Sequence, residues 1–459
     1  MKYLVMLMFL ALTFLYVRSQ PCLPEGIVFT TQTEIDNFQN NYPNCSEIEG
    51  YVTIGEQTSS SNINNLEGLS VITSVGEYLE IRLNDYLVNL NGLHNITAVG
   101  GTFSVVSNDS LVDLSGLEQL SEIGGDCYIG YNKKLKSLAG MDNLTGVEGT
   151  VDIRENDSLE TLTGIENLET IGGGLDIRAN ARLLSIAELD ALNAVGDHIW
   201  INGNFLLTTL EGLEGLSEIT GYLNVTYNNS LADLSGLDNI TSVGGYLEVG
   251  HDDMLESLSG LENLTTIGDY LNLYFNASLA DLSALGNLTE IGGELRVSSN
   301  DILSSLEGLQ NIDAGSISDL YLHNNPALTI CEVESVCNYL AAPNGAIYIT
   351  SNASGCNNQQ EVEAACESIS VEETTWISGL TLHPNPFSTS IGIEYRLVQP
   401  ALVLMRFYNP FGEQVDVIEL QQSTGPQQVI WAPDLPKGIY YFSLQTGDQV
   451  STGKVVLVK

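Results

Sequence analysis

Three tyrosines of this chain stand at a fixed interval and could take part in binding. Tyr222, Tyr246 and Tyr270 are 24 residues apart, and rings held side by side on a surface offer apolar contacts to sugars or peptides. Rings in such columns also suit β-sheet surfaces that bind nothing. We predict a ligand-binding face that contains these three tyrosines and the aromatic residues at related positions, namely Tyr78, Tyr128, Trp200, Tyr274 and Tyr321.

Residues that could catalyse a reaction do not form a recognisable set. The five histidines, at positions 94, 198, 251, 323 and 383, are far apart in the sequence. None occurs in an H-E-x-x-H motif or at metal-ligand spacing. The sequence also contains neither a G-x-S-x-G nucleophile motif nor a phosphate-binding loop. We therefore predict no catalytic residues and expect that the protein is not an enzyme.

Acidic residues recur at the same interval and would place like charges side by side. Divalent cations could relieve that repulsion, because Ca²⁺ is bound by carboxylate oxygens. Calcium is therefore a hypothesis, and no other metal or cofactor is predicted. The pair Asp252-Asp253 is interpreted as a solvated turn rather than a cation site. The acidic column consists of Glu118, Asp142, Glu166, Asp190, Glu214, Asp238 and Glu262.

The seven cysteines fall into three groups. Cys22 and Cys45 lie near the N-terminus and are predicted to form one disulfide. Four more are predicted to form two disulfides, and the sequence does not decide among the three possible pairings. Zinc is the alternative ligand for these four, although their spacing lacks a close C-x-x-C pair. The four are Cys331, Cys337, Cys356 and Cys366, which leaves Cys127 over.

An internal repeat organises the chain around these residues. Leucine recurs every 24 residues from Leu66 to Leu306, with Ile186 at the one gap. A glycine stands two residues after most of these leucines, and Glu188 and Ala284 interrupt that column. A fixed period of this length indicates a solenoid with one turn per repeat. We predict a mainly β fold, a right-handed parallel β-solenoid of about eleven turns.

Each turn contains one short strand. Leu79-x-Ile81 alternates apolar and polar residues, and the same alternation recurs in later turns. Such alternation predicts half-buried strands, which stack into a parallel sheet along the solenoid. The flanking residues, Asn224 among them, are expected to face solvent.

Two further columns are expected to be structural. An asparagine follows each strand, from Asn84 to Asn300, with one substitution by aspartate. Its amide is expected to lie inside a corner and to bond to the backbone of neighbouring turns. Cys127 falls in an inward-facing column, which predicts a buried, unreactive thiol.

The ends of a solenoid expose its core and need covers. Residues 20–55 are predicted to be an N-terminal cap with a short helix at residues 34–38. Residues 329–366 are predicted to be a disulfide-bonded C-terminal cap. We expect a helix across residues 331–339 and a strand at residues 347–349 in this second cap.

Charge and the first residues bear on partners and location. Lys and Arg total 15 against 58 Asp and Glu, for a net charge of -43, of which residues 380–459 carry only -1. Such a surface repels nucleic acid and anionic membranes. Residues 1–19 contain Lys2 and then an apolar run, which predicts a signal peptide. No other stretch is long and apolar enough to span a membrane, so none is predicted in the mature chain.

The repeat resembles the receptor L-domain type of leucine-rich-repeat solenoid. The pattern that carries the resemblance is L-x-I-x-x-N-x-x-L-x-x-L-x-G-L, followed by [IV]-G-G. Segments around Asn44-Cys45 and Val336-Cys337 resemble the caps of that family, so the resemblance covers about residues 21–366. It implies the solenoid fold and says little about the ligand, because such modules bind different partners.

The C-terminal part resembles the type A sorting domain of the type IX secretion system. Alternating apolar runs between Gly and Pro turns independently predict a small β-sandwich here. The resemblance implies contact with the type IX secretion machinery and passage across the outer membrane to the cell surface or the extracellular space. The residues that match are Pro384, Asn385, Pro386, Phe387, Gly412, Gly438, Tyr440, Lys454 and Lys459.

These observations predict a cell-surface or secreted recognition protein, with adhesion to a glycan or protein ligand through the exposed sheet face. Two alternatives remain open. One is a structural surface or matrix component without a defined ligand, and the other is a β-helix polysaccharide lyase or hydrolase, which needs clustered acids or bases on neighbouring turns. The predicted segments are the signal peptide 1–19, N-terminal cap 20–55, solenoid 56–328, C-terminal cap 329–366, linker 367–379 and sorting domain 380–459.

Overall fold

The computed structural model describes residues 20–369, 377–447 and 449–458. It divides into two compact units, with the boundary between Cys366 and Glu367. The predicted signal peptide, residues 370–376 of the predicted linker, and Lys459 of the predicted sorting motif lie outside the described residues. In the parts of the chain that are described, no helix is long and apolar enough to cross a membrane.

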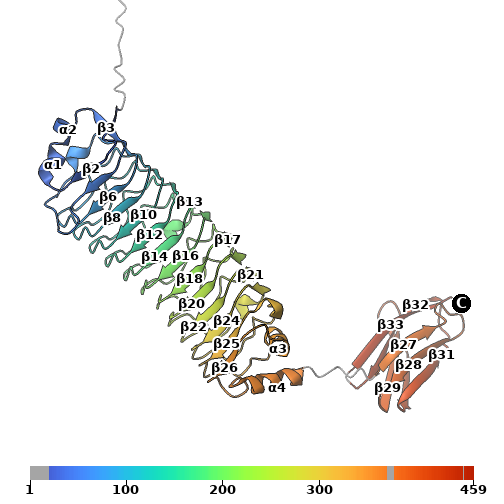
Figure 1. Ribbon diagram of the computed structural model, residues 1–459. Helices are drawn as coiled ribbons and strands as arrows, with labels where there is room; N and C mark the ends of the chain where they lie inside the picture. The colour runs from blue at the N-terminus through green and yellow to red at the C-terminus, as the bar shows by residue number, and fades with distance from the viewer. Residues whose placement is uncertain (1–19, 370–376, 448, 459) are drawn as a thin grey trace, which may run out of the picture. The chain divides into compact units, whose positions relative to one another are not determined.

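The first unit is a solenoid whose main wall is a parallel sheet of fourteen strands (Figure 1). Strands of successive turns pair in register, as Leu79 pairs with Phe103 and Phe103 with Cys127. The predicted parallel β-solenoid is thus confirmed. Its strands are β2 (Ile27–Phe29), β4 (Val52–Ile54), β6 (Leu79–Arg82), β8 (Phe103–Val106), β10 (Cys127–Gly130), β12 (Val151–Arg154), β14 (Leu175–Arg178), β16 (Ile199–Asn202), β18 (Leu223–Thr226), β20 (Leu247–Gly250), β22 (Leu271–Tyr274), β24 (Leu295–Ser298), β25 (Leu320–His323) and β26 (Ile347–Thr350).

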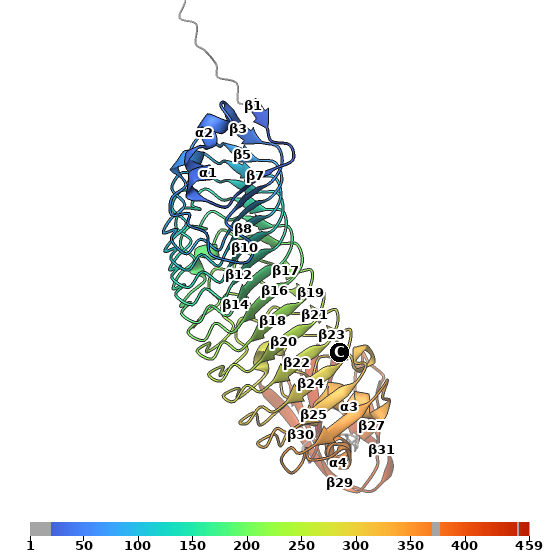
Figure 2. The ribbon, with the colours of Figure 1, turned by 60° about the vertical axis from the view of Figure 1, so that its left-hand side comes forward.

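A second wall of short strands follows another side of the same turns (Figure 2). It consists of an eight-stranded and a four-stranded parallel sheet. Most of these strands have two residues, too few for an alternating pattern to predict them. They are β1 (Gln20–Cys22), β3 (Cys45–Ile48), β5 (Ser74–Val75), β7 (Ala98–Val99), β9 (Glu122–Ile123), β11 (Gly146–Val147), β13 (Thr170–Ile171) and β15 (Ala194–Val195), then β17 (Glu218–Ile219), β19 (Ser242–Val243), β21 (Thr266–Ile267) and β23 (Glu290–Ile291).

Aliphatic side chains at repeated positions fill the space between the walls. The anchor leucines, such as Leu90 and Leu114, are fully buried, and one apolar cluster runs from Phe29 to Val362. Removing this surface from water is the main force that stabilises the stack, at about 25 cal/mol per Å² of apolar area. No turn can bury its leucines alone, so each turn depends on its neighbours.

Glycines two residues after the anchor leucines let the backbone turn sharply. Gly92 has a φ of +109°, and a Cβ atom there would lie 2.1 Å from the carbonyl oxygen of Leu66. Where Glu188 and Ala284 interrupt the column, 3₁₀ helices replace this turn. The 3₁₀ helices are η1 (Glu67–Leu69), η2 (Ala187–Leu189), η3 (Ser283–Leu285) and η4 (Ala314–Ser316).

The asparagine column forms a continuous buried ladder of hydrogen bonds, as predicted. The backbone N–H of Asn108 donates to the Oδ1 atom of Asn132 over 3.0 Å. The Nδ2 atom of Asn108 donates to the carbonyl oxygen of Ile81, 27 residues earlier, over 2.9 Å. The same bonds recur from turn to turn and continue to Asn352. Each asparagine therefore satisfies polar groups of three consecutive turns inside an apolar corner.

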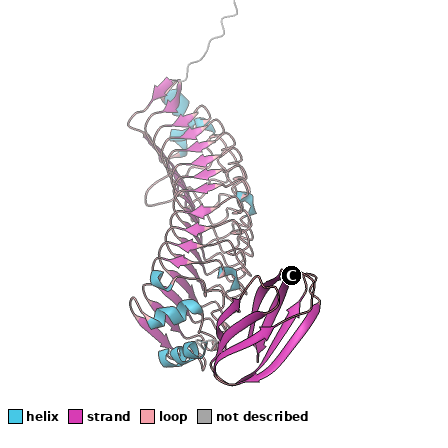
Figure 3. Cartoon of the chain, turned by 90° about the vertical axis from the view of Figure 1, so that its right-hand side faces the viewer, coloured by secondary structure: helices cyan, strands magenta, loops and turns pink. Residues whose placement is uncertain are grey.

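Short helices and disulfides cover both ends of the solenoid (Figure 3). At the front, α1 (Gln32–Asp36) begins at a capping box of Thr31 and Glu34, α2 (Phe38–Asn41) follows, and a disulfide joins Cys22 to Cys45. The predicted helix at 34–38 is thus two short helices. At the rear are α3 (Glu334–Ala341), β26 and α4 (Gln359–Ile369), the last of which the sequence did not predict.

The rear disulfides join Cys331 to Cys356 and Cys337 to Cys366. This settles the pairing that the sequence left open among three possibilities. Cys337 lies in α3 and Cys366 in α4, so the second bridge ties the two helices of the cap together.

The second unit consists of two antiparallel sheets that share one core. Trp431 and Phe407 stack at its centre with ring centroids 3.9 Å apart, and the strands carry the alternating burial expected of a sandwich. Strand β27 begins three residues before the predicted domain start. One sheet has β27 (Ile377–His383), β28 (Ile391–Leu397) and β31 (Gly425–Trp431), and the other has β30 (Gln414–Gln422), β29 (Ala401–Tyr408), β32 (Gly438–Thr446) and β33 (Gln449–Leu457).

Candidate functional site

The outer face of the main sheet carries the residues that the sequence selected for binding. In β16, Ile199 and Ile201 are buried while Trp200 and Asn202 are partly exposed. The expectation that every flanking residue faces solvent is wrong for Asn224, which is 8% exposed. Its amide donates to the Oε2 atom of Glu248 over 2.7 Å, so long neighbouring side chains cover the shorter ones on this face.

Four rings form a column on this face that we call the sheet ladder. Tyr222, Tyr246 and Tyr270 stack with centroids 4.6 Å apart and planes within 4°, and His198 extends the column at 4.5 Å from Tyr222. The predicted tyrosine column therefore exists, with one additional ring. The ring spacing matches the distance of about 4.8 Å between neighbouring strands, so the sheet itself holds the rings in register.

Burial keeps the tyrosine hydroxyls of the sheet ladder un-ionised. It raises the pKa of Tyr222 to about 12, and nearby Tyr246 and acidic groups act in the same direction. The pKa values of Tyr246 and Tyr270 are also raised, first by burial and then by the charge of Glu248. At neutral pH these hydroxyls are hydrogen-bond donors and acceptors rather than anions.

His198 is held in place by two carboxylates. Its Nε2 atom lies 3.0 Å from Asp176 Oδ1, and its Nδ1 atom lies 3.0 Å from Asp197 Oδ2. Sequence analysis did not connect His198 with the tyrosines, although it stands 24 residues before Tyr222. Acids and a potential base thus do meet on neighbouring turns here, and both ring nitrogens are engaged by those acids.

Two other predicted aromatic residues are covered by arginines. The guanidinium of Arg154 lies 4.5 Å from the ring centroid of Tyr128, and that of Arg178 lies 4.4 Å from Trp200. Asp152 pairs with Arg178 at 2.9 Å. Burial raises the pKa of Asp152, and the two arginines partly offset that rise. This part of the face is neutralised by its own side chains, and its rings are less available than those of the sheet ladder.

The remaining predicted residues lie apart from the sheet ladder. Tyr78 stacks on Tyr51 at 4.8 Å near the front of the solenoid. Tyr321 lies under Arg296, with 4.7 Å between the guanidinium and the ring. Tyr274 contacts His251 edge-on at 5.2 Å, at the border of the sheet. The eight predicted aromatic residues therefore form several small groups rather than one surface.

A second column of rings, which sequence analysis missed, follows the C-terminal ends of the strands. Tyr227, His251 and Phe275 stack at 4.2 and 4.7 Å with planes within 13°, and we call them the edge ladder. The residue after each main strand has a positive φ, +53° at Phe275, which directs its side chain away from the sheet. The 24-residue spacing of these rings was visible in the sequence. It was not noticed because only the alternating strand positions were considered.

The acidic column has a structural use that the calcium hypothesis did not include. The carboxylate of Glu118 accepts a hydrogen bond of 2.8 Å from the backbone N–H of Gly116, and the pattern repeats at Asp142 and later members. Asp252, interpreted as part of a solvated turn, is instead fully buried within the asparagine ladder. Over residues 20–369, 377–447 and 449–458, no cluster of three or more potential metal ligands occurs.

Cys127 lies in the core, at 2% exposure. Burial raises the pKa of its thiol to about 12, and the charges of Asp126 and Asp152 act in the same direction. The un-ionised thiol is a poor nucleophile and a poor metal ligand. Its position agrees with the small apolar role that the sequence indicated.

In the second unit, the predicted motif residues meet at one edge of the sandwich. Asn385 bonds through its side chain to the backbone of Lys454 and Val456 in β33. Phe387 is buried, and its backbone bonds to Val456. These contacts connect the start of the unit with its last strand. Elsewhere, Gly412 occupies a turn with positive φ, and the hydroxyl of Tyr440 donates to the carbonyl of Pro436.

The fold is that of a disulfide-capped parallel β-solenoid followed by a separate antiparallel β-sandwich. Two family models match parts of the chain. Residues 381–459 match the secretion system C-terminal sorting domain, and residues 44–140 match the receptor L domain. No curated protein matches the chain. The chain is therefore a cargo of the type IX secretion system with a receptor L-domain solenoid, exported across the outer membrane to the cell surface or the extracellular space.

Proposed function

We propose that this exported chain is a non-enzymatic recognition protein that binds a glycan or protein ligand through the outer face of its main sheet. The observation that carries the proposal is the sheet ladder, four rings in register over consecutive turns. Their outward edges form an apolar strip with hydroxyl groups, already held in one arrangement by the sheet. A surface that is ordered before binding loses little conformational entropy when a ligand arrives.

Polar side chains beside the sheet ladder support the same proposal. Glu248 accepts hydrogen bonds from Asn224 at 2.7 Å and from Asn272 at 3.0 Å. These residues follow the tyrosines at a distance of two positions in each strand. The strip of rings is thus bordered by a row of fixed hydrogen-bonding groups, the combination that ligand-binding surfaces use for affinity and orientation.

Two alternatives make different predictions. A lyase or hydrolase would have to use the cluster of Asp176, His198 and Asp197, where both imidazole nitrogens already face carboxylates. We propose instead that these carboxylates position the first ring of the sheet ladder. A purely structural component would have the same rings with no ligand, since stacked tyrosines also stabilise sheets.

The test compares the whole chain with the triple variant Tyr222→Ser, Tyr246→Ser, Tyr270→Ser on arrays of glycans and peptides. We expect the variant to lose at least about tenfold in affinity, equal to about 1.4 kcal/mol, with an unchanged circular dichroism spectrum. The matched control is Tyr86→Ser, which removes an exposed tyrosine outside the ladder. Undiminished binding by the triple variant contradicts the proposed surface.

The same assay separates the alternatives. Absence of any array ligand supports the structural component. Release of shortened oligosaccharides from a polysaccharide, lost in His198→Ala, would establish the enzyme and overturn the proposal.

A further inference from the structure

The edge ladder ends with an uncovered ring face. Its rings face one another along the solenoid axis, and Phe275 is the last of them. The next turn has Ser299 at the same position, and Ser299 has no ring with which to continue the stack. Phe275 is 51% exposed. One turn beyond it, about 4.8 Å away, there is space for a flat group that the protein does not supply.

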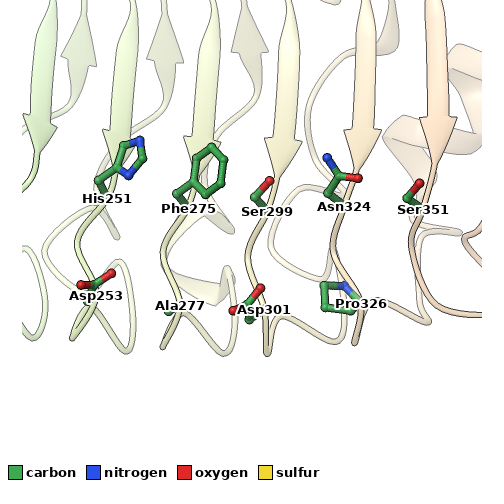
Figure 4. A pocket seen from close by; sticks show the side chains of 9 residues that line it. All are labelled: His251, Asp253, Phe275, Ala277, Ser299, Asp301, Asn324, Pro326 and Ser351. Carbon is green, nitrogen blue, oxygen red and sulfur yellow. The ribbon is translucent and has the colours of Figure 1, made fainter.

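This space belongs to a trench that runs along the solenoid. Its volume is about 640 Å³, within the range of roughly 300–1,000 Å³ typical of ligand sites. Figure 4 shows two rows of side chains along it. The row at the strand ends includes Phe275, Ser299 and Asn324, and the row in the following loops includes Asp253, Ala277 and Asp301.

Hydrogen-bonding groups in the trench remain available beside the free ring face. Within the described residues, neither the carboxylate of Asp301 nor the hydroxyl of Ser299 has a side-chain partner. Asp253, by contrast, accepts a hydrogen bond from Asn229. Ala277 stands between the two aspartates and leaves the floor of the trench open. One apolar ring face thus lies next to an unengaged acceptor and an unengaged hydroxyl.

We propose that this trench is a second binding site, separate from the sheet ladder, and that its ligand is a neutral oligosaccharide. One sugar ring lies at the level of Ser299 with its C–H face on Phe275, so that it extends the edge ladder. Its hydroxyls donate to Asp301 and exchange hydrogen bonds with Ser299 and Asn324. A sugar ring combines an apolar face with a rim of donors and acceptors, and the trench offers partners for both.

Other ligand classes fit fewer of these groups. No basic side chain lines the trench, and the carboxylates of Asp253 and Asp301 repel uronic acids and sulfated sugars. An aromatic peptide side chain would stack on Phe275 but leave Asp301 without a partner. A lysine or arginine would pair with Asp301 but would leave Ser299 and Asn324 unused.

The test uses the whole chain on an array of neutral, uronic-acid and sulfated oligosaccharides, followed by calorimetry with the strongest neutral binder. Two variants act on the stacking position in opposite ways. Phe275→Ala removes the platform, and Ser299→Phe fills the proposed sugar position with a ring of the protein. Both are expected to weaken binding at least tenfold. Phe275→Tyr retains the ring and is expected to retain binding.

Tyr131→Ala is the matched control, because Tyr131 occupies the same position in an earlier turn, outside the trench. It should leave the affinity unchanged. Absence of binding to every neutral oligosaccharide overturns the proposal, as does equal affinity in Phe275→Ala and Ser299→Phe. Binding of hexalysine that is lost in Asp301→Asn would identify a cationic peptide site instead. The triple tyrosine variant leaves the trench intact, so the two proposed sites fail independently.

Discussion

Asp252 is the one acidic residue in the buried asparagine ladder. Its Oδ1 atom accepts a bond of 2.6 Å from the backbone N–H of Asn228, as an asparagine would. Its Oδ2 atom occupies the place of an amide that donates to a backbone carbonyl in other turns. Among the described residues this atom has no partner. Burial raises the pKa of Asp252 well above its usual value, so the protonated acid is the form that fits the ladder.

Replacing Asp252 by asparagine should therefore stabilise the solenoid. The variant restores the missing donor, and an unsatisfied buried polar group costs about 1–3 kcal/mol. Because the pKa of Asp252 is raised on folding, the native chain loses stability as the pH rises from about 4 toward the folded-state pKa. The gain in melting temperature of Asp252→Asn should thus be largest near pH 8 and vanish near pH 4.

Asn156→Asp is the control for this prediction. It places the same carboxyl in a turn that now has an amide, and it should destabilise the chain near pH 8 and less so near pH 4. A melting temperature for Asp252→Asn that equals that of the native chain at every pH would show that Asp252 has no cost in the ladder.

Some residues of the candidate site were predictable and others were not. The column of Tyr222, Tyr246 and Tyr270 followed from a fixed period and the alternation of a strand. His198 was missed because it differs in residue type from the column that it completes. The trench was not predictable, because it depends on where the backbone turns after each strand and on a small residue, Ser299, beside a large one.

At the scale of elements, the sequence predicted what repeats and missed what does not. The main strands and the first helix of the rear cap follow from alternation and cap signals. The short strands of the second wall have too few residues to show a pattern. Helix α4 was overlooked because residues 359–369 were interpreted only as a disulfide-bonded end. Gaps in the glycine column were visible, but that they select a 3₁₀ turn is evident only in three dimensions.

The glycine turns lead to a prediction at this scale. Gly164 has a φ of +115°, and an added Cβ atom would lie 2.1 Å from the carbonyl oxygen of Leu138. Gly164→Ala should destabilise the solenoid by about 1–3 kcal/mol, the usual cost of a forced backbone conformation. The turns at Glu188 and Ala284 show a 3₁₀ alternative that limits the loss. Urea unfolding measures the change.

The control exchange is Ala284→Gly, in a turn that already accepts a side chain. It should cost no more than about 1 kcal/mol, the entropic difference between the two residues. Equal stabilities of Gly164→Ala and the native chain would mean that the glycine turn and the 3₁₀ turn are interchangeable.

At the scale of the whole molecule, the two units differ sharply in charge. Residues 21–379 have 8 basic and 52 acidic residues, whereas residues 380–459 have 5 and 6. Like charges stand in columns along the solenoid, so its folded form has a large electrostatic repulsion. The nearly neutral second unit is an internal reference for any effect of salt.

Salt should accordingly stabilise one unit and not the other. Raising NaCl from about 0.02 M to about 0.5 M shortens the screening length from about 20 Å to below 5 Å. We expect the calorimetric transition of the solenoid to move up by several degrees, and that of the sorting domain to move much less. If the solenoid transition stays fixed or falls, its columns of acids are not a source of instability.

The uniform register between turns has a consequence for how such molecules can change over generations. Every coil presents the same hydrogen-bonding edge to the coil before it and the coil after it, so a duplicated coil fits between two existing ones. The rod then grows by one strand spacing, about 4.8 Å, while both covers stay as they are. Gene segments of this length can therefore alter how far the protein reaches, and how many rings stand in a row, without redesign of the interior.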